Sequence, residues 1–231
     1  MNQIAAASSP LRRRTLGLVY LLYFLAATAS ALFMKGLLVA NDAAATAGSI
    51  LAHADAYRAG LAADLVANAL YIAVTVLLCR LLAPAGRRTA LVAAAFGLVG
   101  CAVQVFGNTF RLATLVVLQG DDWLAPFNGH QVHAAALLGL KLHAQTFNSS
   151  LVLFALFDLL VGCLVVRSTL LPRALGALLV VAGLGWLSFL WPPLAATLSP
   201  VVMPLGALAE FALMLWLLVR GVDEDADARG T

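Results

Sequence analysis

The stretch that decides the fold reads RSTLLPRALGALLVVAGLGWLSFLW, from Arg167 to Trp191. Two arginines flank a short turn at its start, and no charged residue follows Arg173 as far as Trp191. Membrane helices are long apolar runs that cross roughly 30 Å of hydrocarbon, and basic residues collect in the loops on the cytoplasmic side. The stretch therefore predicts the end of one membrane helix, a tight basic turn, and a second membrane helix.

The composition of the whole chain supports this interpretation. Of its 231 residues, 63% are hydrophobic and only 11% are charged, whereas a soluble domain carries about 25% charged residues. Because so few polar groups cannot cover an apolar core in water, lipid must supply the outer surface. The net charge of +3 is better explained by arginines clustered at one membrane face than by a nucleic-acid surface. We expect membrane lipid as a partner and no nucleic acid.

Six apolar runs along the chain are long enough to be membrane spans. They cover residues 15–39, 59–82, 89–118, 142–166, 171–191 and 200–219. The predicted fold is an all-α polytopic membrane helix bundle with six transmembrane helices. It occupies residues 15–220, between a basic tail at 1–14 and an acidic, disordered tail at 221–231.

Arginines and acidic residues alternate between successive loops. The basic segments hold Arg12, Arg13, Arg14, Arg80, Arg87, Arg88, Arg167, Arg173 and Arg220, and the other loops hold Asp42, Asp55, Asp121 and Asp122. The positive-inside rule then places both termini in the cytoplasm, and the acidic tail hardly affects it because acidic residues contribute little.

The segments on the predicted outer side have features of their own. Residues 41–58 predict a short interfacial helix capped by Asp42 or Thr46, and residues 120–129 predict an aromatic interfacial loop that ends in an Asn-Gly turn. Residues 130–166 are helical in pattern over about 55 Å. Because this exceeds the membrane thickness, we expect a break near Gly139 or a helix that protrudes outward.

Several of these segments resemble a known family. They are the Arg167–Gly176 junction, the GLGW motif ending at Trp186, and the outer stretch from Asp42 to Asp64, which contains DAAATAGSI and YRAGLAADL. They are similar to a bacterial family of six-helix membrane proteins catalogued as domain of unknown function four-three-eight-six, and the resemblance spans nearly the whole chain. It implies a multi-pass protein of the bacterial cytoplasmic (inner) membrane, and it carries no activity or catalytic residue.

Polar residues within the spans form two stripes at helical spacing. Asp64, Asn68, Tyr71 and Thr75 make one, and Gln104, Asn108 and Arg111 make the other. Charged groups in membrane spans face the bundle interior and find partners, so we expect Asp64 to pair with Arg111. The pair either stabilises the bundle or belongs to an outward-opening polar pocket lined by Arg58, Asp64, Asn68, Asn108, Arg111 and His143.

Two further carboxylic acids, Asp158 and Glu210, lie deep within predicted spans. They are either neutral groups hydrogen-bonded to their neighbours or a proton relay between two helices. The spans that hold them lack the Gly/Pro-interrupted halves typical of secondary transporters, with Pro204 only a few residues into its predicted helix.

No catalytic or metal motif accompanies these groups. His130 and His133 have i, i+3 spacing, and His143 or Asp121 could add a third ligand, but a lone His-x-x-His is weak evidence. The sequence contains neither His-Glu-x-x-His nor Gly-x-Ser-x-Gly. We therefore predict no metal and no cofactor.

Three functions are compatible with these features. The first is a membrane protein that binds or moves a small molecule or lipid through the outward-facing polar pocket. The second is an intramembrane enzyme with Asp64 or His143 as its acid or base. The third is a structural or regulatory partner of another membrane protein. The absence of a catalytic motif favours a protein that is not an enzyme, and the sequence specifies neither the ligand nor the oligomeric state.

Overall fold

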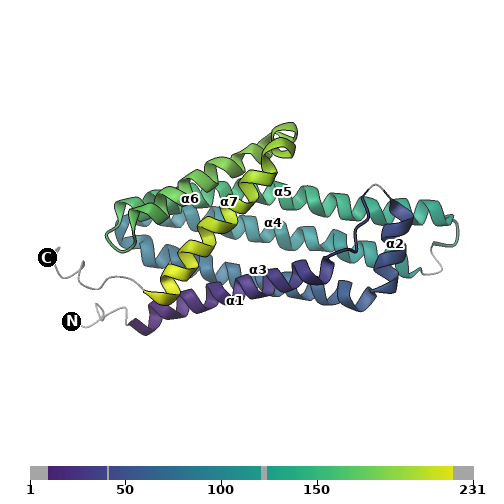
Figure 1. The fold of residues 1–231 in the computed structure, drawn as a ribbon, viewed down its shortest axis with the longest axis horizontal. Coiled ribbons are helices and arrows are strands. Elements are labelled where there is room, and N and C mark those ends of the chain that lie inside the picture. The colour runs from purple at the N-terminus through teal and green to yellow at the C-terminus, as the bar shows by residue number, and fades with distance from the viewer. Residues whose placement is uncertain (1–9, 41, 121–123, 221–231) are drawn as a thin grey trace. The chain divides into compact units, whose positions relative to one another are not determined.

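The computed structural model describes residues 10–40, 42–120 and 124–220, and its regular elements in these ranges are all helical (Figure 1). The α-helices are α1 (Pro10–Met34), α2 (Ala43–Ala52), α3 (Ala54–Leu82), α4 (Arg87–Gln119), α5 (Gly129–Arg167), α6 (Arg173–Trp186) and α7 (Pro192–Val219). Two 3₁₀ turns, η1 (Ala83–Ala85) and η3 (Leu187–Leu190), follow α3 and α6. The predicted all-α fold is confirmed.

Within the described ranges, six helical segments are long and apolar enough to cross a membrane, as in a multi-pass integral membrane protein. They correspond one to one with the six predicted spans, but several bounds differ. The first helix ends at Met34 rather than 39, the fourth begins at Gly129 rather than 142, and the last begins at Pro192 rather than 200. Pro200 and Pro204 therefore both lie inside α7, the latter well beyond its first turns. The orientation of the helices remains a prediction.

The predicted terminal tails lie mainly outside the described residues, which exclude 1–9 and 221–231. α1 already begins at Pro10, within the segment predicted as a basic tail. Of the predicted aromatic loop, residues 121–123 are also outside the described part, and Leu124 to Asn128 lead directly into α5.

The described residues form two compact units. Unit 1 comprises those within 1–22, 70–100 and 151–231, and unit 2 comprises those within 23–69 and 101–150. Helices α6 and α7 belong entirely to unit 1, and α2 belongs entirely to unit 2. Each of the other four contributes residues to both.

In unit 1, the basic junction joins two closely packed helices, as the sequence predicts. A side-chain carbon added at Gly162 of α5 would lie 2.7 Å from the carbonyl oxygen of Gly176 on α6, so only glycine allows this approach. The α-helix of α6 ends at Trp186, whose Nε1 donates a 3.2 Å hydrogen bond to the carbonyl oxygen of Val202 in α7. The predicted fifth span thus changes to a 3₁₀ turn before Trp191.

In unit 2, α2 begins at the predicted cap and packs against the protein. Asp42 accepts a 2.8 Å hydrogen bond from the backbone amide of Ala45, which confirms it as the N-cap. Thr46 has another role, because its hydroxyl bonds both the amide and the carbonyl group of Val39. One face of α2 lies in a hydrophobic cluster made of Leu37, Ala47, Ile50, Tyr57, Leu115, Leu118, Ala136 and Leu140.

Helix α5 runs without interruption for 39 residues, so the break near Gly139 is wrong, and the other predicted alternative, a helix that protrudes outward, stays a prediction. Gly139 instead permits close contact with α4, because a carbon added there would lie 2.5 Å from the hydroxyl oxygen of Thr114. That hydroxyl donates a 3.1 Å hydrogen bond to the carbonyl oxygen of Ala136. The predicted Asn-Gly turn is a helix cap, in which Asn128 and Gln131 exchange side chain–backbone hydrogen bonds of 3.0 Å.

Candidate functional site

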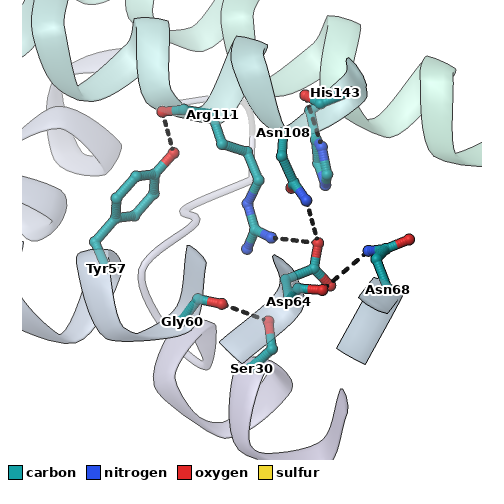
Figure 2. A network of polar contacts seen from close by, with 9 residues as sticks. Ser30, Tyr57, Gly60, Asp64, Asn68, Asn108, Arg111 and His143 are labelled. Atoms are coloured by element: carbon teal, nitrogen blue, oxygen red, sulfur yellow. Dashed lines mark hydrogen bonds and ion pairs between the residues drawn. The ribbon is translucent and has the colours of Figure 1, made fainter. Parts of the chain in front are cut away.

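Asp64, on α3 in unit 2, is the centre of the polar site (Figure 2). Its Oδ2 accepts a 2.7 Å hydrogen bond from the side-chain amide of Asn108 on α4. The same oxygen lies 3.7 Å from Nη1 of Arg111, also on α4. The side chain of Asp64 is 29% exposed and that of Arg111 is 10% exposed. The predicted ion pair between Asp64 and Arg111 is therefore present, with an amide donor alongside it.

Two asparagines turn their amide nitrogens toward Asp64. Nδ2 of Asn68 donates a 2.9 Å hydrogen bond to the backbone carbonyl of Asp64, and Nδ2 of Asn108 donates to the carboxylate. Both acceptors are oxygens, so the two amide oxygens must face elsewhere. Both asparagines are buried. Neither Asn68 Oδ1 nor Asn108 Oδ1 has a hydrogen-bond partner within the described part of the chain.

Arg111 is also anchored through its backbone. The hydroxyl of Tyr57, at the start of α3, donates a 2.9 Å hydrogen bond to the carbonyl oxygen of Arg111 (Figure 2). Tyr57 is 1% exposed, so this bond ties α3 to α4 inside unit 2. The position of Tyr57 in the sequence gave no sign that its hydroxyl would reach α4.

His143 on α5 lies beside this network. Its Nδ1 is 3.2 Å from the carbonyl oxygen of Gly107 on α4. A carbonyl only accepts, so Nδ1 carries the hydrogen and Nε2 of the neutral ring is left as an acceptor. His143 is close enough to Arg111 and Asp64 to interact with both electrostatically. No hydrogen bond joins it to either side chain within the described residues.

Close helix contacts hold these side chains in place. A carbon added at Gly107 would lie 3.1 Å from the methyl carbon of Thr146, so this glycine lets α5 approach α4 beside His143. On the other side of α3, the buried hydroxyl of Ser30 in α1 donates a 2.9 Å hydrogen bond to the carbonyl of Gly60 (Figure 2). Neither contact can be predicted from the sequence, because each depends on which helices pack against one another.

Arg58 was predicted to line the same pocket, but among the described residues its ion pair lies outside this network. Its guanidinium forms a 2.9 Å ion pair with Asp55, one turn earlier on the same helix. The side chains of Arg58 and Asp55 are 50% and 99% exposed. An exposed i, i+3 pair of this kind contributes little to stability.

A second polar cluster lies in unit 1. Glu210 of α7 accepts a 2.8 Å hydrogen bond from the hydroxyl of Tyr71 on α3, and the Tyr20 side chain of α1 is a further hydrogen-bond partner. Asp158 of α5 interacts electrostatically with Glu210. Asp158 is 1% exposed and Glu210 6% exposed. Tyr71 belongs to the predicted polar stripe that begins at Asp64, but its hydroxyl donates a hydrogen bond to Glu210.

The histidines outside the Asp64 site lie in different surroundings. His130 is exposed, His133 is half-buried, and His53 bonds the backbone carbonyl of Ser49. Among the residues that the structure describes, no group of three or more His, Cys, Asp or Glu side chains is arranged to hold a metal ion. Asp121, the possible further ligand, lies outside the described residues.

Comparison with known proteins identifies a family but no activity. The family model described as "Domain of unknown function (DUF4386)" matches residues 15–221. No curated protein and no solved structure matches the chain. The family resemblance expected from the sequence is confirmed.

Proposed function

We propose that this chain, which belongs to the DUF4386 family, is a membrane protein that binds a small polar molecule or a lipid headgroup at the Asp64 site. The observation that carries the proposal is the pair of buried amide oxygens, on Asn68 and Asn108, that lack partners beside a partly exposed carboxylate. Buried polar atoms are almost always hydrogen-bonded. A ligand that satisfied these oxygens would therefore gain binding energy from them.

The free atoms of the site specify the chemistry of the ligand. Asn68 and Asn108 each offer an acceptor oxygen, and Asp64 adds the unshared lone pairs of its carboxylate. Their complement is a molecule with several hydrogen-bond donors, such as hydroxyl or ammonium groups. Arg111 neutralises Asp64, so the site as a whole suits a polar or zwitterionic group.

The position of the site along its helices favours the level of lipid headgroups. Asp64 lies sixteen residues from Arg80 on α3, about 24 Å at the rise of an α-helix. Asn108 lies twenty-one residues from Arg87 on α4, about 32 Å by the same measure. With these arginines at the cytoplasmic face of a hydrocarbon layer of roughly 30 Å, the site falls near the opposite boundary. This supports an outward-facing site.

The two alternatives have less support. Acid–base catalysis by Asp64 and His143 calls for a hydrogen bond between the groups or to a shared point, and none joins them in the described residues. A purely structural role predicts that every buried polar group is paired. Five buried side-chain atoms in the described residues have no partner: Asn68 Oδ1, Thr75 Oγ1, Asn108 Oδ1, Asp158 Oδ2 and Ser188 Oγ.

The first test is native mass spectrometry of protein purified from its own membrane. We expect a co-purifying molecule on the wild-type protein that is lost in Asp64→Asn. Asp55→Asn is the matched control, because it makes the same chemical change on the same helix at a carboxylate outside the network. A phospholipid mass identifies a headgroup ligand, and a smaller mass identifies a soluble one. The same bound species on all three proteins would contradict the proposal.

A second test uses lipids of defined composition. Phosphatidylethanolamine carries an ammonium group with three donors, whereas the choline group of phosphatidylcholine carries none. If the ligand is a headgroup, wild-type protein in mixed bilayers will retain phosphatidylethanolamine preferentially. The double variant Asn68→Leu/Asn108→Leu will lose that preference, since it lacks both amide oxygens. Equal preference in the two proteins would exclude the amide oxygens as the recognition element.

A further inference from the structure

The carboxyl groups of Asp158 and Glu210 form a site separate from the Asp64 network, within unit 1. They come from α5 and α7, fifty-two residues apart in the chain, and both are nearly inaccessible to solvent. They interact with one another, and no arginine or lysine forms an ion pair with either within the described part of the chain. The energy of two like charges held together in a dry interior is high enough that such pairs keep a proton between them.

The hydrogen bonds around the pair show where a proton can be held. The hydroxyl of Tyr71 donates to Oε1 of Glu210 at 2.8 Å, so this oxygen is already used as an acceptor. Oδ2 of Asp158 has no partner among the described residues although the residue is 1% exposed. A buried carboxylate oxygen is costly to leave unsatisfied. A proton on or next to Asp158 would give its Oδ2 atom a hydrogen bond. It would also remove the repulsion between the two carboxylates.

The surroundings of the pair are aromatic and hydroxylic. The ring of Tyr71 packs edge-on against Phe154, with centroids 5.3 Å apart, and against Tyr20 at 6.2 Å. Within the described residues, the hydroxyls of Tyr71 on α3 and Tyr20 on α1 are hydrogen-bond partners of Glu210, and Asp158 interacts with Glu210 electrostatically. Hydroxyl groups both donate and accept hydrogen bonds, so they can pass a proton as well as hold one.

We propose that Asp158 and Glu210 form a proton-binding site in which the two buried carboxyl groups together hold one exchangeable proton. The Oδ2 atom of Asp158, which has no partner among the described residues, is the oxygen that this proton would satisfy. Binding and release of that proton changes the charge of the pair by one. The site does not depend on a ligand at Asp64.

Infrared spectroscopy counts the proton directly, because a carboxylic acid absorbs apart from a carboxylate and from the amide groups. At neutral pH, the double variant Asp158→Asn/Glu210→Gln should lose carboxylic acid intensity equal to one group per chain relative to wild type. Asp64→Asn, which removes a carboxylate from the other site, should leave that intensity unchanged. A difference of zero means that both groups are ionised, and a difference of two means that each holds its own proton. Either result would overturn the proposal.

Two further arms test exchange and the identity of the ion. On transfer to heavy water the acid band should shift, as it must if the proton leaves and returns; a band that never shifts shows a sealed structural proton and refutes an exchangeable one. At constant pH, sodium chloride should leave the band unchanged when it replaces choline chloride. A band that sodium removes would assign the site to that cation instead.

Dicyclohexylcarbodiimide provides a measurement that needs no variant. This apolar reagent modifies protonated carboxyl groups in membrane interiors. Applied to the wild-type protein, it should label a peptide that contains Asp158 or Glu210, as detected by mass spectrometry after digestion. Absence of label on both residues would contradict the proposal even if the double variant failed to fold.

Discussion

Asp64 and Arg111 lie on different helices, α3 and α4, with the carboxylate oxygen Oδ2 3.7 Å from the guanidinium nitrogen Nη1. The guanidinium side chain is nearly buried, whereas the carboxylate keeps part of its surface exposed. This difference in exposure gives the two side chains different roles. Arg111 depends on Asp64 for compensation of a buried charge, and Asp64 can still reach a ligand.

A double-mutant cycle tests this relationship. Asp64→Asn should destabilise the protein by about 1–3 kcal/mol, because it leaves the buried Arg111 charge without its partner. The double variant Asp64→Asn/Arg111→Gln should cost less than the sum of the single changes, with a coupling of about 1 kcal/mol. Thermal unfolding in one detergent measures all four proteins. Strict additivity would show that the ion pair contributes nothing.

The contact between Trp186 and Gly206 predicts a strong effect from a single methyl group. A carbon added at Gly206 of α7 would overlap the indole ring of Trp186. Gly206→Ala should therefore cost about 1–3 kcal/mol, as overpacking does, and weaken the Trp186–Val202 hydrogen bond. Gly48→Ala in α2 is the matched control, since nothing lies within 4 Å of the added carbon. It should be neutral or stabilising by up to about 1 kcal/mol, and equal losses in both variants would refute the packing argument.

The side-chain hydrogen bond that caps α2 predicts a change in local stability at the start of this helix. Asp42→Ala removes the acceptor of the Ala45 amide and should cost about 1 kcal/mol. Asp42→Asn keeps an acceptor oxygen and should restore most of that stability. Hydrogen–deuterium exchange of the peptide that contains Ala45 provides the measurement. Unchanged exchange in Asp42→Ala would mean that packing on the hydrophobic cluster holds the helix without the cap.

The Tyr71–Glu210 hydrogen bond predicts a modest cost for Tyr71→Phe. The variant keeps the ring that packs on Phe154 and removes only the hydroxyl. Side-chain hydrogen bonds between membrane helices contribute about 0.6 kcal/mol on average, so a small fall in the unfolding temperature is expected. Glu210→Gln keeps an acceptor oxygen for Tyr71 and serves as the control. A loss of several kcal/mol would show that the hydroxyl has a larger structural role.

The arginine distribution predicts the topology. Green fluorescent protein fused to the C-terminus should fluoresce, because both termini are expected in the cytoplasm, and alkaline phosphatase fused there should be inactive. A cysteine introduced at Gly129, which is exposed at the start of α5, should react with an impermeant maleimide added from outside. The reverse pattern would show that the chain has the opposite orientation in the membrane and that the Asp64 site faces the cytoplasm.

Several features of the site were predictable from spacing. The pairing of Asp64 with Arg111 followed from two polar stripes, since an unpaired charge in a membrane span is costly. The Asp42 cap followed from the residue type ahead of an apolar run. These predictions succeeded because each depends on local geometry or on the cost of burying one charge.

Other features depended on which helices face each other. Glycine at position 139 is compatible with a break and with close packing, and only the neighbouring Thr114 on α4 decides for packing. Arg58 lies near Asp64 in the chain but turns to the exposed Asp55. The bond from Tyr71 to Glu210 joins residues 139 positions apart, a separation that no helical period can reveal.

The sequence by itself determined that six segments are long and apolar enough to span a membrane, because hydrocarbon accepts only long apolar segments whose backbone hydrogen bonds close internally. That requirement acts on each segment separately and is visible in a run such as Arg173 to Trp191. Only the tertiary structure decided which polar side chains within those segments become partners. It assigns Asp64 to Asn108 and Arg111, and Glu210 to Tyr71 and Asp158, since a buried polar group takes its partner from whichever helix packs against it.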